Sequence, residues 1–212
     1  MTHRPERPGV CFVTGRAATA DRPVVDVAKA AIEGGCDLVQ VREKDMAGGP
    51  LLALARSVVD AAKQHRGGCA VVVNDRLDVA LAARAAGVHL PADGLAIGDA
   101  RRVAGKKFVI GRSVHALAEA RQAQKDGADY LFFGPVFESP DKAVFGPPQG
   151  PDALRKVVET VRIPVWAIGG INPETAARLR GLAIAGVAAI SFIAAAPDPA
   201  GAVRALRDSL LG

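Results

Sequence analysis

The sequence predicts an α/β protein, a (βα)8 TIM barrel formed by residues 1–212 as a single domain. Short apolar runs alternate with helical stretches almost from end to end, and eight such pairs can be read along the chain. The apolar runs are nearly continuous, as in parallel strands that are buried on both faces. Eight βα units in about 210 residues fit a small closed barrel. The competing architecture is an open doubly wound sheet, but no GxGxxG motif opens the first unit.

The expected strands are short runs rich in valine, isoleucine, leucine and phenylalanine. Their ranges are 9–14, 37–43, 69–75, 87–91, 106–113, 129–137, 164–171 and 186–193. Apolar residues at helical spacing predict a helix after each strand, over residues 24–33, 51–64, 77–85, 98–104, 116–125, 152–160, 173–182 and 200–211. Several helices end at a glycine just before the next strand, as in GGCDLVQ and DGADYLFF, and glycine suits the left-handed conformation after a helix.

Composition narrows the classes of function. The net charge of +5 is too mild to require nucleic acid, and one Trp, one Tyr and seven Phe are too few for base-stacking surfaces. The most apolar stretch, 182–196, is shorter than the ~20 residues that span a bilayer, and the N-terminus has no signal-like apolar run. Three cysteines without a CxxC pair argue against disulfides and a zinc site. We therefore expect a cytoplasmic protein with small anionic ligands and no membrane or nucleic-acid partner; a homodimer is compatible with the sequence.

Polar residues at the carboxyl ends of barrel strands are the candidates for chemistry. The second strand ends in Gln40, Arg42 and Lys44, which alternate with Val41 and Glu43 and should point together toward the barrel mouth. Two cations and an amide on one face can bind a phosphate or diphosphate. The alternative is a solvated strand end, although two like charges at this spacing would otherwise repel each other.

The next three strand ends add candidates for metal and substrate. Asp75 can hold Mg²⁺ together with substrate phosphate oxygens, or Asn74 and Asp75 can cap the following helix. His89 is interpreted as a core histidine or as one that lines the site, with lining favoured over catalysis. Ser113 can donate to a phosphate or a heterocycle, or cap a helix, and His115 is interpreted as a structural residue of the first helical turn.

The last two strands predict a second anion site. Gly169 and Gly170 precede the expected helix at residue 173, and their backbone amides can cradle a phosphate. Ile190 and Ser191 close the eighth strand, where the serine hydroxyl can join the cradle. The loops after strands seven and eight are the recurrent phosphate site of barrels.

The segment 138–151 after the sixth strand is the longest loop in the predicted barrel. A loop of this length in a compact domain is usually functional. It carries Ser139 and Lys142, and Lys142 can close over a bound anion, although a solvated lysine is the simpler interpretation of that residue alone.

Seven motifs occur in order along nearly the whole chain: QVREK, VND, VHL, IGRSVH, the FGPVF segment that ends in Lys142, AIGGI and AIS. Each is weak alone, but together they resemble the thiamine phosphate synthase family and its relatives, the TenI-type thiazole tautomerases. The resemblance implies a barrel enzyme that joins hydroxymethylpyrimidine diphosphate to thiazole phosphate or its carboxylate. Pyrophosphate leaves and thiamine phosphate forms.

The resemblance also implies roles for individual residues. Those that would hold the pyrimidine diphosphate are Gln40, Arg42, Lys44, Asn74 and Lys142. Ser113 would contact the pyrimidine or the leaving group, and Asp75 would bind Mg²⁺. Ser139 would lie near the thiazole, and Gly170, Ile190 and Ser191 would hold its phosphate. The implied mechanism is dissociative. Mg²⁺, Arg42 and Lys142 would stabilise the departing pyrophosphate, and the thiazole nitrogen would capture a cation-like methylene carbon.

Two departures from the family pattern leave the reaction open. The synthases usually read HLGQ followed, after one residue, by a second metal-binding Asp. Here HLPADG puts Gly94 at that position and Asp93, the candidate second ligand, one residue early. The tautomerases use a histidine just after the glycine of the sixth strand. This chain has Pro135 at that position, and the synthases also have proline there. The leading hypothesis is a synthase with an altered metal site; the alternatives are a tautomerase that uses another group such as His89, and a non-catalytic regulator that binds thiamine phosphate or thiazole phosphate.

Overall fold

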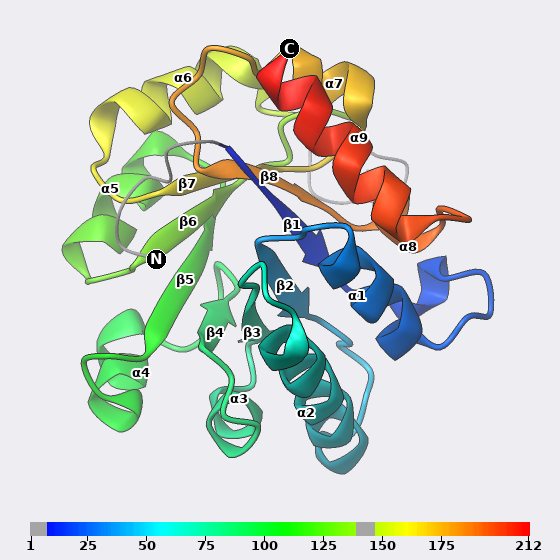
Figure 1. The fold of residues 1–212 in the computed structure, drawn as a ribbon. Helices are drawn as coiled ribbons and strands as arrows, with labels where there is room; N and C mark the ends of the chain where they lie inside the picture. The colour runs from blue at the N-terminus through cyan, green and yellow to red at the C-terminus, as the bar shows by residue number, and fades with distance from the viewer. Residues whose placement is uncertain (1–7, 139–146) are drawn as a thin grey trace.

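A closed barrel of eight parallel strands forms the centre of the molecule (Figure 1). The computed structural model describes residues 8–138 and 147–212. The strands are β1 (Gly9–Val13), β2 (Leu38–Val41), β3 (Ala70–Asn74), β4 (Gly87–Leu90), β5 (Val109–Val114), β6 (Tyr130–Phe133), β7 (Val165–Ile168) and β8 (Gly186–Ala189). They are neighbours in sequence order, and β8 pairs with β1. The predicted (βα)8 barrel is therefore confirmed, and the open sheet is excluded.

Helices surround the barrel on its outer face (Figure 1). They are α1 (Val24–Glu33), α2 (Gly48–Gln64), α3 (Leu77–Ala82), α4 (Ile97–Ala104), α5 (Leu117–Lys125), α6 (Gly150–Thr160), α7 (Pro173–Ala177), α8 (Ser191–Ala194) and α9 (Pro199–Leu211), with the 3-10 helix η1 (Arg16–Ala18) after β1. Helix α7 is shorter than predicted because the amides of Arg178 and Leu179 bond to carbonyls three residues back. In the described part of the chain, no helix has the length and apolarity to cross a membrane.

The end of β8 corrects the sequence interpretation. A strand through residue 193 is wrong, because β8 ends at Ala189 and α8 begins at Ser191. The backbone leaves the extended region at Ile190, where φ is −103° and ψ is −85°. Periodicity could not detect this turn, since a short apolar run fits a buried strand and a buried helix equally well. Ser191 therefore opens a short helix after β8 instead of closing the strand.

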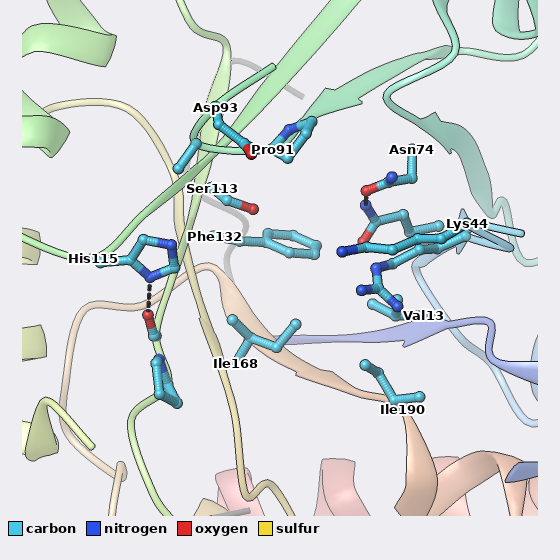
Figure 2. Close-up of a pocket in the computed structure, with 15 residues that line it drawn as sticks. Val13, Lys44, Asn74, Pro91, Asp93, Ser113, His115, Phe132, Ile168 and Ile190 are labelled. Carbon is cyan, nitrogen blue, oxygen red and sulfur yellow. Dashed lines mark hydrogen bonds between the residues drawn. The ribbon is translucent and has the colours of Figure 1, made fainter. Parts of the chain in front are cut away.

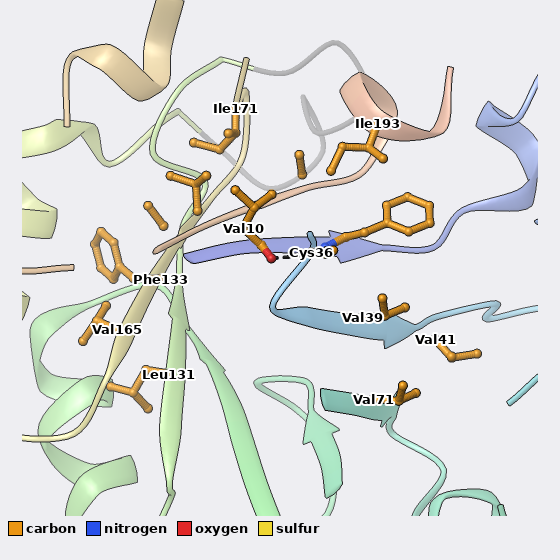
Figure 3. Packing of buried hydrophobic residues seen from close by; sticks show 14 of the residues in the cluster. Val10, Cys36, Val39, Val41, Val71, Leu131, Phe133, Val165, Ile171 and Ile193 are labelled. Carbon is orange, nitrogen blue, oxygen red and sulfur yellow. Dashed lines mark hydrogen bonds between the residues drawn. The ribbon is translucent and has the colours of Figure 1, made fainter. Parts of the chain in front are cut away.

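Alternate strand residues divide the core into two layers. Figure 3 shows one set, which includes Val10, Val39 and Phe133, on the outer face of the strands toward the helices. The other set fills the barrel interior and comprises Cys11, Val13, Leu38, Val72, Tyr130, Phe132, Trp166, Ala185 and Ala188. Inward positions nearer the carboxyl ends of the strands are more polar, as at Gln40 and Ser113. This alternation places a polar mouth above an apolar barrel floor.

Candidate active site

A cavity of about 280 Å³ opens at the carboxyl ends of the strands. Its polar lining consists of Gln40, Arg42, Lys44, Asn74, Asp93, Ser113 and His115. Figure 2 shows Lys44 and Asn74 on one side, and Asp93, Ser113 and His115 on the other, with the ring of Phe132 between them. The volume is near the lower end of the range for small-molecule sites. The cavity therefore combines a cationic wall with a facing wall of hydrogen-bonding groups.

The cationic wall is built by alternate residues of β2 and its continuation. Gln40 is buried and donates from Nε2 to Oδ1 of Asn74 over 3.0 Å, which joins β2 to β3. Arg42 is half-buried and Lys44 is exposed, so the wall grows more solvated toward the mouth. Burial lowers the pKa of Arg42, and the neighbouring Glu43 carboxylate opposes that change. Gln40, Arg42, Lys44 and Asn74 line the same cavity, whereas Asp75, which the sequence assigned to the same cluster, does not.

Glu43 holds this wall from behind. Its carboxylate accepts from Thr14 Oγ1 at 2.7 Å and from the Arg16 amide at 3.1 Å. The same Thr14 hydroxyl oxygen accepts from the Arg42 amide at 2.8 Å. Because Glu43 is buried and bonded on the outer side of the barrel, its neighbour Arg42 must face the cavity.

His89 lies behind the wall that faces these cations. Of the two positions that the sequence left open for His89, core or cavity lining, the structure shows the core: it is 1% exposed, and Ser113 stands between it and the cavity. Its Nε2 lies 2.8 Å from Ser113 Oγ, and its Nδ1 lies 3.0 Å from the Tyr130 hydroxyl. Burial first, then the charges of Arg112 and Arg42, lower the pKa of His89 to about 3. The imidazole is therefore neutral at ordinary pH.

The two candidate metal ligands lie on adjoining strand ends. Asp75 follows β3 in the left-handed region, with φ of +62°, and its side chain is exposed. A Cβ atom built at Gly94 would lie 3.2 Å from Asp75 Oδ1, so this carboxylate borders the loop that carries Asp93. Asp93 lines the cavity and Asp75 does not. Within residues 8–138 and 147–212, no cluster of three or more acidic, histidine or cysteine side chains suits a metal.

The glycines after β7 lie beneath the segment that follows β6. Gly169 and Gly170 have φ of +100° and +64°. A Cβ at Gly169 would lie 2.6 Å from Pro135 Cα, and one at Gly170 would lie 2.3 Å from the Glu138 carbonyl oxygen. Glycine is thus required here by backbone crowding as well as by backbone conformation. Ile190 reaches the cavity, whereas Gly169, Gly170 and Ser191 do not line it.

The structure brings in residues that the sequence interpretation missed. His115 lies between β5 and α5, not in a helical turn, and lines the cavity while its Nδ1 contacts the Gly134 carbonyl oxygen. Val13, Phe132 and Ile168 supply the apolar floor. Strand alternation could have found the apolar residues, because they share the inward face with Gln40 and Ser113. Ser139 and Lys142 lie outside the described residues.

The chain is similar to known proteins over most of its length. The family described as thiamine monophosphate synthase matches residues 10–193. A thiamine-phosphate synthase of Roseiflexus castenholzii is 38% identical over 205 residues, or 96% of this chain and 89% of its own. The bifunctional ThiM/ThiE protein of Symbiobacterium thermophilum is 44% identical over 185 residues, and those cover 87% of this chain and 38% of that longer relative.

Solved structures with the same barrel fold include one from the same family. A thiamine phosphate pyrophosphorylase from Pyrococcus furiosus superposes with a TM-score of 0.87 at 34% identity, covering 96% of this chain and 95% of that one. A KGPDC structure from Streptococcus mutans, at 15% identity and a TM-score of 0.68, shares the fold alone. With the family match over most of the barrel, these relatives show that the chain belongs to the thiamine monophosphate synthase family.

Proposed function

We propose that this chain is a transferase that couples hydroxymethylpyrimidine diphosphate to a thiazole phosphate and releases pyrophosphate. The observation that carries the proposal is the convergence of Arg42, Lys44 and the Gln40–Asn74 pair on one side of a cavity, opposite Ser113 and Asp93. A diphosphate is the kind of group that such a wall binds. Family membership supports the same substrate class.

The reaction needs stabilisation of charge rather than a protein nucleophile. As the bond from the methylene carbon to oxygen breaks, negative charge grows on the pyrophosphate. Arg42 and Lys44 line the cavity and would stabilise that charge. The ring of Phe132 offers an apolar surface for the aminopyrimidine, and Ser113 offers a hydroxyl. The thiazole nitrogen then captures the electron-poor carbon. Lys142, which lies outside the described residues, would close over the diphosphate from the loop.

Asp75 and Asp93 fit Mg²⁺ as the accompanying ion. Mg²⁺ is usually bound by one or two carboxylates together with water and substrate phosphates, so a larger acidic cluster is not required. Two exposed carboxylates after adjoining strands, β3 and β4, would suit that chemistry. When bound, the ion would neutralise charge on the diphosphate.

The thiazole phosphate would bind where β7 and β8 end. Gly169, Gly170 and Ser191 follow β7 and β8, where barrels commonly bind phosphate, and would offer backbone amides and a hydroxyl. Ile190, the residue before Ser191, lines the cavity and would orient the thiazole toward the pyrimidine. Ser139 would contribute from the loop after β6. We expect the enzyme to work in the cytoplasm, where free thiols such as Cys11, Cys36 and Cys69 persist.

The tautomerase hypothesis finds less support. Its proposed acid or base, His89, is buried behind Ser113, and its lowered pKa makes it a weak base that holds no extra proton at ordinary pH. The position after Gly134, where tautomerases use histidine, is Pro135. A regulator would bind thiazole phosphate or thiamine phosphate without converting substrate, so only an assay of product formation distinguishes it from an enzyme.

The direct test is product formation. Purified protein is incubated with pyrimidine diphosphate, thiazole phosphate and MgCl₂, and thiamine phosphate is measured by thiochrome fluorescence beside a known synthase. We expect magnesium-dependent product that falls about 100-fold in Arg42→Ala, because one preorganised charge contact to the leaving group is lost. Arg56→Ala, on the exposed face of α2, is the matched control. Binding without product would identify a regulator and overturn the proposal.

A further inference from the structure

A glycine on β5 allows a hydrogen bond inside the barrel between side chains of β4 and β6, the strands on either side of it. Gly111 is the register partner of His89 on β4 and of Tyr130 on β6. A Cβ atom at Gly111 would lie 2.1 Å from Cζ of Tyr130, so the phenol ring occupies the space above this glycine. The Tyr130 hydroxyl can therefore reach His89 Nδ1 across the intervening strand, at 3.0 Å.

The same imidazole reaches the cavity wall with its other nitrogen. His89 Nε2 lies 2.8 Å from Ser113 Oγ, and Ser113 lies two residues after Gly111 on the inward face of β5. Figure 2 shows the Ser113 hydroxyl directed into the cavity. Tyr130 and His89 are both buried, and neither lines the cavity. The row Tyr130–His89–Ser113 thus runs from the barrel interior to the site.

Hydrogen-bond satisfaction fixes the direction of this row. Among the described residues, the Tyr130 hydroxyl has one hydrogen-bond partner, His89 Nδ1. If Nδ1 carried the proton, the buried phenol proton would have no acceptor, which native interiors avoid. The phenol therefore donates to Nδ1, and Nε2–H donates to Ser113 Oγ. The serine proton is left for a ligand in the cavity.

We propose that Tyr130 and His89 are positioning residues that hold the Ser113 hydroxyl as a hydrogen-bond donor to the substrate. This inference deepens the proposed function, on which it rests for the identity of the ligand. The atom that accepts from Ser113 is an oxygen of the diphosphate or a ring nitrogen of the aminopyrimidine. In both cases, because Nε2 of His89 is protonated, the Ser113 hydroxyl accepts from His89 and cannot donate its own proton to it.

The first test reads the proton directly. A two-bond ¹H–¹⁵N spectrum of the histidine rings distinguishes a protonated from a bare nitrogen, and His89→Gln identifies the His89 signals among the four histidines. We expect a bare Nδ1 and a protonated Nε2 in the wild type, and a mixture of tautomers in Tyr130→Phe. A wild-type His89 with its proton on Nδ1 would overturn the proposal.

The second test asks whether Tyr130 acts through Ser113. Binding of inorganic pyrophosphate and of the uncharged hydroxymethyl aminopyrimidine is measured by calorimetry in MgCl₂. Tyr130→Phe should weaken one of the two probes about threefold to tenfold, the size of one hydrogen bond, and the affected probe identifies the acceptor. In a Ser113→Ala background, Tyr130→Phe should change neither affinity. An equal loss in both backgrounds, or no loss for either probe, contradicts the proposal.

A control separates positioning from packing. Phe133 is buried on the same strand but faces the helices, so Phe133→Leu should lower stability without changing the His89 tautomer or either affinity. If the proposed function were wrong but the positioning role correct, the assays would give a different set of results. The wild type would make no thiamine phosphate, while the tautomer and the dependence of probe binding on Tyr130 would remain as expected.

Discussion

The guanidinium of Arg112 donates a hydrogen bond of 2.8 Å to the carbonyl oxygen of Ala92. A second, of 2.9 Å, goes to the carbonyl oxygen of Leu95. Arg112 therefore ties β5 to both sides of the loop that contains Asp93. Since Ser113 is the next residue, the end of one strand positions a proposed substrate contact and a proposed metal ligand together.

Loosening this tie should weaken the proposed magnesium site. Arg112→Lys cannot bridge two carbonyl groups with the same planar fork, so the loop 91–95 should gain freedom. We expect the Mg²⁺ concentration for half-maximal activity to rise about tenfold, as for other residues that support metal ligands. Arg102→Lys on α4, whose partner is the exposed Asp99, is the control. Unchanged magnesium dependence in Arg112→Lys would rule out this role.

Restoring aspartate at position 94 should succeed only with a second change. A Cβ at Gly94 would lie 2.8 Å from Pro91 Cδ, closer than side chains normally approach. Gly94→Asp alone should therefore destabilise the loop and lower activity. Pro91→Gly combined with Gly94→Asp should tolerate the new carboxylate beside Asp75 and lower the Mg²⁺ requirement. Magnesium titrations of the single and double variants test this, and a single variant that matches the double one would argue against crowding by Pro91.

The buried carboxylate of Glu43 should matter more to stability than the neighbouring Asp45. Glu43→Gln keeps one acceptor oxygen for two donors, the Thr14 hydroxyl and the Arg16 amide. One donor is therefore left poorly paired, which should lower the free energy of unfolding by about 1–3 kcal/mol. Asp45, whose side chain is 72% exposed, pairs with Arg16 at the surface, so Asp45→Asn should cost less than about 1 kcal/mol. Urea unfolding at pH 7 measures both. Equal losses of unfolding free energy in the two variants would mean that the buried hydrogen bonds of Glu43 do not stabilise the protein more than the surface ion pair of Asp45.

Buried His89 should make the protein less stable in acid. The unfolded histidine has its ordinary pKa of 6.5, whereas the folded one is lowered to about 3. Between these values the unfolded state binds the extra proton, so the free energy of unfolding falls as the pH falls, by up to about 1.4 kcal/mol per unit. Tyr130, Ser113 and Phe132 contact His89, and the nearby charges are those of Arg42 and Arg112, so no group there can neutralise a histidine cation.

The measurement compares wild type with His89→Gln by urea unfolding at pH 7, 6 and 5. The wild type should lose stability more steeply below pH 6.5, because glutamine has no proton to bind. Parallel curves for the two proteins would contradict the burial of a neutral His89.

Much of the barrel could be predicted because its patterns are local. Helix α1 has the predicted bounds, and all eight strands lie within their predicted ranges apart from the final residue of β5. The alternation of Gln40, Arg42 and Lys44 with Val41 and Glu43 follows from the two-residue period of a strand, and these three polar residues do line one cavity. Their roles in binding stay a prediction until the assays are done.

Other features depend on contacts between distant segments. The apolar run after β8 has no pattern that separates strand from helix, so the turn at Ile190 was not predictable from it. The GG pair after β7 suggested a phosphate cradle, but whether the segment 135–138 crosses above it is decided only by the fold.

The sequence by itself determined the barrel, the order of its strands and the set of polar residues at the strand ends, because period and spacing are properties of adjacent residues. Only the tertiary structure decided which of those residues meet. His89 and Tyr130 are 41 positions apart, and they touch because the closed sheet places Gly111 between them and glycine leaves the space open. Register across three strands, rather than any local pattern, brings the imidazole behind Ser113.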